Sequence, residues 1–235
     1  MLTEEFDLEK IDERELNAKL QALTGQGARA ILRNTHARHN IAVNVKGEID
    51  IQVHGSAGFY CCGFMNGPAV TVHGNAGWYA ADNMLGGSLV VMKNAGSNFA
   101  PSMIGGTALV RGSAGSRIGY GLKGGTVVIC GDVGMLTGQQ ITGGRIILLG
   151  KVGQNTGESM YGGAIFYRKG MLAGMGSNIH SRPLEAEEGS GLAELFTQYE
   201  IQFDPADFEC LTPKSGKQKF VIFKPQHRLK EKAAQ

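Results

Sequence analysis

Glycine pairs recur every 19 residues through most of this chain, and no other feature of the sequence restricts the fold as strongly. The pairs are Gly86-Gly87, Gly105-Gly106, Gly124-Gly125, Gly143-Gly144 and Gly162-Gly163, and Gly67-Pro68 extends the series backwards. A column of single glycines keeps the same period at Gly58, Gly77, Gly96, Gly115, Gly134 and Gly153. Glycine makes up 36 of the 235 residues, and its strict period excludes a flexible linker. Each 19-residue repeat is therefore expected to form one coil of a solenoid.

Apolar residues alternate within each repeat, which predicts strands. The inward columns are Ile51, Val70, Leu89, Ala108, Val127, Ile146 and Ile165, and, two residues on, Val53, Val72, Val91, Val110, Ile129, Leu148 and Tyr167. A third apolar column is Met65, Met84, Met103, Leu122, Ile141 and Met160, and a small-residue column is Cys62, Ala81, Ala100, Gly119, Gly138 and Gly157. We therefore expect an all-β fold, a right-handed single-stranded parallel β-helix with about 19 residues per coil. Glycine would serve its corners, where φ is positive.

The ends of a solenoid need caps, because they expose unpaired strand edges. Asp12 and Glu15 have capping-box spacing, and Leu16, Leu20 and Leu23 follow at helical intervals. An N-terminal helix ending near Gly25 is predicted.

The repeat is lost after Gly170. We predict a short helix over Leu192–Tyr199 and a final strand over Lys219–Phe223. The chain from Lys214 onward is expected to form a basic, solvated tail. We expect three regions: a helical cap over 1–27, the parallel β-helix over 28–176, and a short C-terminal α/β cap or docking arm with a basic tail over 177–235.

Charge and composition argue against several classes. The formal net charge is +2, which gives the main body no nucleic-acid footprint. The N-terminus, MLTEEFDLEK, is acidic and unlike a signal peptide, and there is no run of about 18 apolar residues, so a cytoplasmic protein is expected. The four cysteines, Cys61, Cys62, Cys130 and Cys210, fit no zinc spacing and are interpreted as reduced.

Few residues suggest chemistry. Gly119–Gly124 spells G-x-G-x-x-G but lies within a repeat, so we interpret it as structural rather than phosphate-binding. His54 and His73 share an outward column, and a surface stack is favoured over a metal pair because no third ligand follows. We expect no catalytic, cofactor-binding or metal-binding residue in the chain.

Two further pairs are less defined. Cys62 occupies the small-residue column and is expected to pack, whereas the role of Cys61 stays open. His36 and His39 lie just before the first coil, where a loop role is favoured over an entrance or interface.

An outward-facing column is unexpectedly apolar. It consists of Gln52, Thr71, Val90, Leu109, Val128, Ile147 and Phe166, and Met92, Cys130 and Leu149 add to it in the next outward column. A monomer seldom exposes so long an apolar face. Either the C-terminal segment folds back over it or another subunit covers it, and we expect both, because the C-terminal segment holds too little apolar mass to cover the whole face.

The run GSAGFYCCGFMNGPAVTVHGNAGWYAADNMLGG, followed by repeats of G-x-x-G-x-x-x-G-x-x-M-x-G-G, resembles the C-terminal GXGXG β-helix domain of the glutamate synthase large subunit, in its stand-alone form. The resemblance covers roughly residues 28–176. Lys93, Ala81 and Ala100 depart from frequent glycine positions, without threatening the fold. A subunit of formylmethanofuran dehydrogenase shares this β-helix superfamily.

The resemblance implies a non-catalytic structural subunit of a transferase complex. Separate β-helix subunits occur in three-subunit complexes that include methylamine–glutamate N-methyltransferase, also called N-methylglutamate synthase. The implied partners are a class II glutamine amidotransferase-like subunit and a synthase-like subunit that carries FMN and an iron–sulfur cluster. Equivalent subunits of a split glutamate synthase or of formylmethanofuran dehydrogenase remain alternatives, and which complex and stoichiometry apply stays open.

A polysaccharide-active enzyme is a remote alternative. Glycoside chemistry needs paired carboxylates, and the repeats from Gly86 to Gly163 contain only Asp132 and Glu158.

Overall fold

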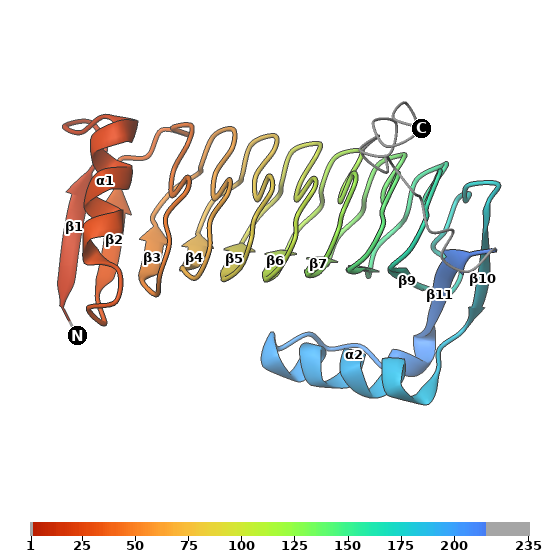
Figure 1. The fold of residues 1–235 in the computed structure, drawn as a ribbon. Helices are drawn as coiled ribbons and strands as arrows, with labels where there is room; N and C mark the ends of the chain where they lie inside the picture. Colours follow the sequence, from red (N-terminus) through yellow and green to blue (C-terminus); the bar gives the residue numbers. More distant parts are fainter. Residues whose placement is uncertain (1, 215–235) are drawn as a thin grey trace, which may run out of the picture.

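The computed structural model describes residues 2–214. Eleven strands, two α-helices and one short 3-10 helix follow in this order: β1 (Thr3–Asp7), α1 (Glu13–Leu23), β2 (Arg29–Arg33), β3 (Asp50–Val53), β4 (Ala69–Val72), β5 (Ser88–Val91), β6 (Thr107–Val110), β7 (Thr126–Ile129), β8 (Arg145–Leu148), β9 (Ala164–Arg168), β10 (Ile179–Pro183), α2 (Ala186–Gln198), η1 (Pro205–Asp207) and β11 (Phe208–Pro213). Figure 1 shows the strands stacked in one row, with α1 at one end and α2 beneath the other half.

The expected parallel β-helix is confirmed. All eleven strands form one sheet in the order β1-β2-β3-β4-β5-β6-β7-β8-β9-β11-β10, parallel from β1 to β9. From β3 to β9 the register advances by 19 residues per strand, as in the alignment of Val70 with Leu89. A second line of parallel bridges joins Ala57, Ala76, Ala95, Ala114, Val133 and Val152 on another side of the coils. The two inward strand columns and the column from Met65 to Met160 are buried in one core.

The third side of each coil alternates left-handed residues with others, and we call it the left-handed wall. In the second coil Tyr60, Cys62 and Phe64 have φ of 59°, 61° and 56°, and every coil through Ser159 repeats the pattern. Tyr60 N donates forward to Trp78 O at 3.0 Å, whereas Cys62 N donates back to Ile41 O at 2.8 Å. The wall is thus hydrogen-bonded to both neighbouring coils. The expectation that glycine takes the positions of positive φ was too narrow. The backbone hydrogen bonds between neighbouring coils hold other residue types in this conformation as well.

The small-residue column lies at the middle of this wall, as its composition predicted. Its members are buried and have positive φ in all six coils. In the later coils the column holds glycine because the opposite strand presents isoleucine: a Cβ on Gly138 would lie 2.4 Å from Ile165 Cδ1. Cys62 and Ala81 occupy the same column in the earlier coils. The side chain on the opposite strand therefore decides where glycine is required.

The N-terminal cap contains the predicted helix and an unpredicted strand. Asp12 is the N-cap of α1 and accepts a hydrogen bond from Glu15 N at 2.8 Å, and Leu16, Leu20 and Leu23 are buried. The helix ends at Leu23 with Thr24 as its C-cap, and Gly25 follows with φ of 73°, in agreement with the predicted stop near Gly25. β1 pairs parallel with β2 at the edge of the sheet; its sequence TEEFD carries too little apolar pattern to predict a strand.

The C-terminal region differs more from expectation. Helix α2 begins at Ala186, six residues before the predicted Leu192, and contains Gly189 and Gly191 in its first half. β11 runs antiparallel between β9 and β10, and neither β10 nor β11 was predicted. The predicted strand Lys219–Phe223 and most of the basic tail lie outside the described residues.

Replacing Gly138 with alanine should destabilise the fold through both backbone strain and a clash with Ile165. Gly170 is the matched control, because it has φ of 76° but a methyl group added there would have no atom within 4 Å. We expect Gly170→Ala to lower the free energy of unfolding by about 1–2 kcal/mol. Gly138→Ala should cost about 1–3 kcal/mol more, from overpacking. Denaturant unfolding followed by circular dichroism measures both, and equal losses would contradict the close approach of the two walls.

Candidate functional site

The residues that the sequence singled out for possible chemistry lie apart from one another. His54 and His73 stack on adjacent coils with ring centroids 4.6 Å apart, as predicted, and His73 Nε2 lies 3.0 Å from Gln52 Oε1. Partial burial, together with the neighbouring His54, lowers the pKa of His73. Within residues 2–214 no three His, Cys, Asp or Glu side chains come together in a group that could hold a metal ion.

Cys61 and Cys62 are both completely buried on the left-handed wall, with their sulfur atoms 3.6 Å apart. Because Cys62 is left-handed, these consecutive side chains both enter the core, whereas in a strand they would alternate. Burial raises the pKa of the Cys62 thiol well above its ordinary value. Both cysteines are therefore packing residues, which extends to Cys61 the interpretation first made for Cys62.

The G-x-G-x-x-G sequence at Gly119–Gly124 lies on the left-handed wall and its following corner. Gly119 and Gly121 have φ of 65° and 62°, and strand β7, not a helix, comes next. A dinucleotide fingerprint needs a helix directly after the loop. The glycines here shape a coil.

His36 and His39 lie on the segment between β2 and β3 and have different partners. His36 Nε2 lies 2.9 Å from Glu9 Oε1, which ties this segment to the N-terminal cap. His39 Nδ1 accepts a hydrogen bond from Phe59 N at 2.9 Å, and its ring stacks on Phe59 with centroids 4.6 Å apart. His39 thus begins a row of stacked aromatic rings, a role that sequence reasoning missed.

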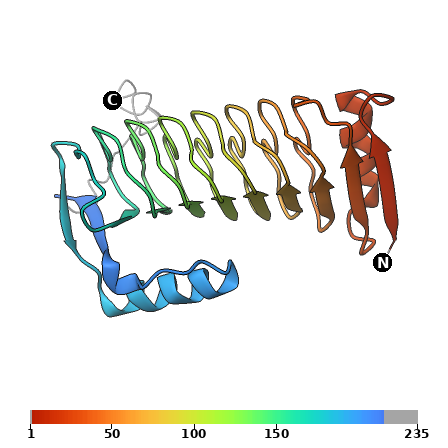
Figure 2. The same ribbon diagram turned by 180° about the vertical axis from the view of Figure 1, so that it is seen from behind.

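The apolar outward face of the strands is largely covered by the chain itself. Residues 184–213, which we call the C-terminal arm, place α2 beneath the sheet and then rejoin the sheet as β11 (Figures 1 and 2). The outward side chains of the strands and the apolar side chains of the arm form a second buried cluster. It consists of Leu109, Val128, Ile147, Leu149, Phe166, Leu192, Leu195, Phe196, Phe208 and Cys210, and the partly buried Val90 packs against it. The expectation that the C-terminal segment folds back over this wall is confirmed from Leu109 onward. Met92, at 44% exposure, remains open.

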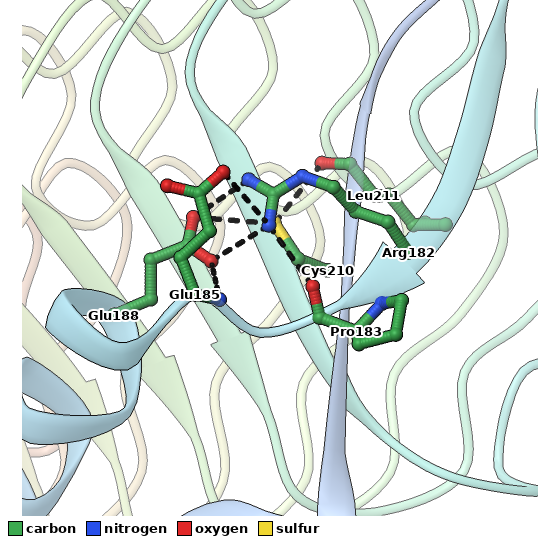
Figure 3. Close-up of polar contacts among 6 residues, drawn as sticks. All are labelled: Arg182, Pro183, Glu185, Glu188, Cys210 and Leu211. Atoms are coloured by element: carbon green, nitrogen blue, oxygen red, sulfur yellow. Dashed lines mark hydrogen bonds and ion pairs between the residues drawn. The ribbon is translucent and has the colours of Figure 1, made fainter.

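A charged network fastens the arm to the sheet (Figure 3). Arg182 on β10 donates two hydrogen bonds of 2.8 Å to the carboxylate of Glu188 on α2, and Glu185 Oε1 lies 3.6 Å from Arg182 Nη1. Glu188 also accepts a hydrogen bond from Glu185 N. Cys210 on β11 lies against the same carboxylate, with Sγ 3.9 Å from Glu188 Oε1. One carboxylate therefore connects α2 to both strands.

The network sets the protonation of its members. The hydrogen bonds from Arg182 hold the pKa of Glu188 below its ordinary value, and those bonds also raise the pKa of Arg182. Burial, followed by the charge of Glu188, raises the pKa of Cys210 to about 12. Cys210 stays a thiol at neutral pH and is a structural residue.

A ladder of side-chain hydrogen bonds parallel to the solenoid axis escaped the sequence analysis. Each side chain accepts from the backbone N–H nineteen residues later: Ser56 from Asn75, Asn75 from Asn94, Asn94 from Ser113, Ser113 from Asp132 and Asp132 from Lys151. The signal was available, because these positions form a column of short polar acceptors in the repeat. The ladder holds the coils in register outside the core.

The left-handed wall presents an aromatic patch in its second and third coils, made of the exposed Phe59, Tyr60, Phe64 and Trp78 and the partly buried Tyr79. Phe59 stacks on Trp78 with centroids 5.7 Å apart, and Tyr60 on Tyr79 at 5.1 Å. Trp78 is 53% exposed, Phe64 48%, and Phe59 and Tyr60 42% each. Exposed aromatic rings in a contiguous patch are typical of protein interaction surfaces.

These features define a class of protein: a parallel β-solenoid with capped ends, a self-covered strand wall and an exposed aromatic patch. More particularly, the chain belongs to the GXGXG motif family, whose model matches residues 7–187. The match supports the resemblance to the C-terminal GXGXG domain of glutamate synthase. A search of curated proteins gives no significant match. No helix within residues 2–214 is long and apolar enough to cross a membrane.

Removing the charge of Glu188 should loosen the C-terminal arm. Charge-assisted hydrogen bonds contribute about 1.5–3 kcal/mol, so Glu188→Gln should lower the free energy of unfolding at pH 7 by about 1–3 kcal/mol, whereas Glu187→Gln, on an exposed carboxylate of the same helix, should change little. The folded pKa of Glu188 is depressed, so its contribution is complete above its unfolded pKa and is lost as pH falls through the folded value.

Denaturant unfolding at pH 7 and at about pH 3 tests this prediction. The difference between Glu188→Gln and the wild-type chain should be present at pH 7 and shrink in acid. Equal stabilities at pH 7 would show that the network does not hold the arm.

Proposed function

We propose that this chain is the non-catalytic structural β-helix subunit of a glutamate-synthase-like transferase complex in the cytoplasm. The particular complex proposed is methylamine–glutamate N-methyltransferase, in which the chain would hold an amidotransferase-like subunit and a synthase-like subunit together. The observation that carries the proposal is the match to the GXGXG family over residues 7–187, which span the solenoid and the start of its arm.

The geometry supports a holding role. The coils are joined on three sides, by the strand ladder, by the bridges from Ala57 to Val152, and by the left-handed wall. Each coil is thus fastened to its neighbours on every side, which suits a subunit that holds others in place. Its faces differ, because the strand wall is covered by the arm while Met92 and the left-handed wall remain open.

The chemistry is assigned to the partners. FMN and an iron–sulfur cluster would reside in the synthase-like subunit, and ammonia release would begin in the amidotransferase-like subunit. This chain would position the other subunits and provide the surfaces that they bind. A split glutamate synthase is the second candidate, since the same family match supports both and the amine that is used distinguishes them.

The test is native purification of the tagged chain from its own cells, with mass spectrometry of the co-purifying proteins and a flavin spectrum of the eluate. The proposal predicts an amidotransferase-like chain and a flavin-containing chain in constant ratio, and an eluate that forms N-methylglutamate from methylamine and glutamate. Ammonia-dependent glutamate formation instead would favour the split synthase. A colourless eluate holding this chain alone would refute both.

A further inference from the structure

The aromatic patch lies on a part of the left-handed wall that carries almost no charge. Among residues 59, 60, 63 and 64 of the second coil and their equivalents one and two repeats later, Asp82 is the charged residue, and Gly63 and Pro101 are buried. Asp82 is half-buried and accepts a hydrogen bond from Asn83 Nδ2 at 2.9 Å. The other polar residues of the patch rim are Asn83, Ser97, Asn98 and Ser102. An aromatic centre with an uncharged polar rim has the anatomy of a protein interface.

We infer that this patch is the contact between two copies of the chain, related by a two-fold axis near Trp78. In a two-fold contact the same surface faces itself, so a patch with strong net charge would repel its copy. This patch is nearly neutral. A two-fold axis at Trp78 would put the rings at the centre of the contact, where binding energy concentrates, and the Asn and Ser residues at its edge.

The shape of the wall also favours a second copy. The Phe59–Trp78 and Tyr60–Tyr79 stacks form two ridges parallel to the solenoid axis, with rings 5.7 Å and 5.1 Å apart. If the two-fold axis lies in the contact plane and runs parallel or perpendicular to the solenoid axis, the second copy presents the same two ridges parallel to those of the first, so ridges of one copy can lie in the grooves of the other.

The aromatic rings supply about half of the area of a specific contact. A fully covered aromatic side chain buries about 150–250 Å², and roughly half of most of these rings is exposed, which gives about 400 Å² of aromatic surface per copy. A standard interface buries about 800 Å² per partner. The rim residues and the neighbouring coils of the same wall can supply the remainder.

The repeat itself supplies substitutions that the wall tolerates. Ser97 and Ser116 occupy the position of Phe59 and Trp78 in later coils, and Asn98 occupies that of Tyr60 and Tyr79. Phe59→Ser with Tyr79→Asn therefore removes two rings and leaves residue types that this wall already holds. Trp78 is the single tryptophan of the chain, so its fluorescence reports whether the patch is covered.

The experiment uses the purified full chain, with its molar mass measured by light scattering after size-exclusion chromatography and its tryptophan emission followed on dilution. We expect twice the chain mass of 25.0 kDa at high concentration, and a shift of the Trp78 emission to longer wavelength as the pair dissociates. Phe59→Ser/Tyr79→Asn should weaken the pair about tenfold or more. Met92→Arg is the control, since it removes a side chain of similar exposure from another face and introduces the residue type of Arg111.

A chain that stays monomeric at tens of micromolar, or a pair that survives Phe59→Ser/Tyr79→Asn unchanged, would overturn the inference. Should that double variant fail to fold, Trp78→Ser tests the same contact by mass alone. A monomer whose Trp78 becomes shielded only in an assembly with other proteins would assign the patch to a different partner and also overturn the pairing. Because the pairing requires only this chain, its failure leaves the proposed function intact.

Discussion

The hydrogen bonds that join each coil to the next in a fixed register of 19 residues are the constraint on which the rest of this structure depends. They place like residues above one another, so every demand made by one coil is made again by its neighbours. A buried methionine stands above a methionine, and a left-handed residue above a left-handed residue. The same alignment produces the Ser56–Lys151 ladder and the aromatic stacks on the surface. Core, walls and candidate interaction surface are therefore consequences of one register.

The sequence predicted the parts of the structure that repeat from coil to coil, and little of the parts outside the repeat. Residues such as Val70 and Leu89 occur in copies, so each copy confirmed the others, and the columns yielded the strands, the core and the coil length. The left-handed wall was only partly foreseen, since Tyr60 and Phe64 have side chains that ordinarily avoid positive φ. Backbone hydrogen bonds to both neighbouring coils override that preference, and no single-residue propensity reveals such bonds.

The C-terminal arm and the aromatic patch could each be predicted only in part from the sequence. The apolar column from Leu109 to Phe166 predicted that some segment covers this face. Helix α2, however, begins earlier than its apolar residues suggest, and it is tied to the sheet by Arg182 and Glu188, which are not part of the repeat. In the patch, Phe59 and Trp78 were visible in the repeat, yet only the structure shows that both rings point outward and stack. The C-terminal arm covers the strand wall, whereas the aromatic patch on the left-handed wall stays open. This contrast supports an interaction role for the patch.

The central claim is that this chain acts through its surfaces, as a rigid body between other subunits. A cryo-EM map of the native assembly purified through this chain tests it most directly. The account predicts an unbent stack of coils, with the arm still covering Leu109 to Phe166, the Trp78 patch against a second copy, and flavin-bearing density in a neighbouring subunit on another face. A map in which the coils separate, or in which a cofactor or substrate binds within this chain, would contradict it.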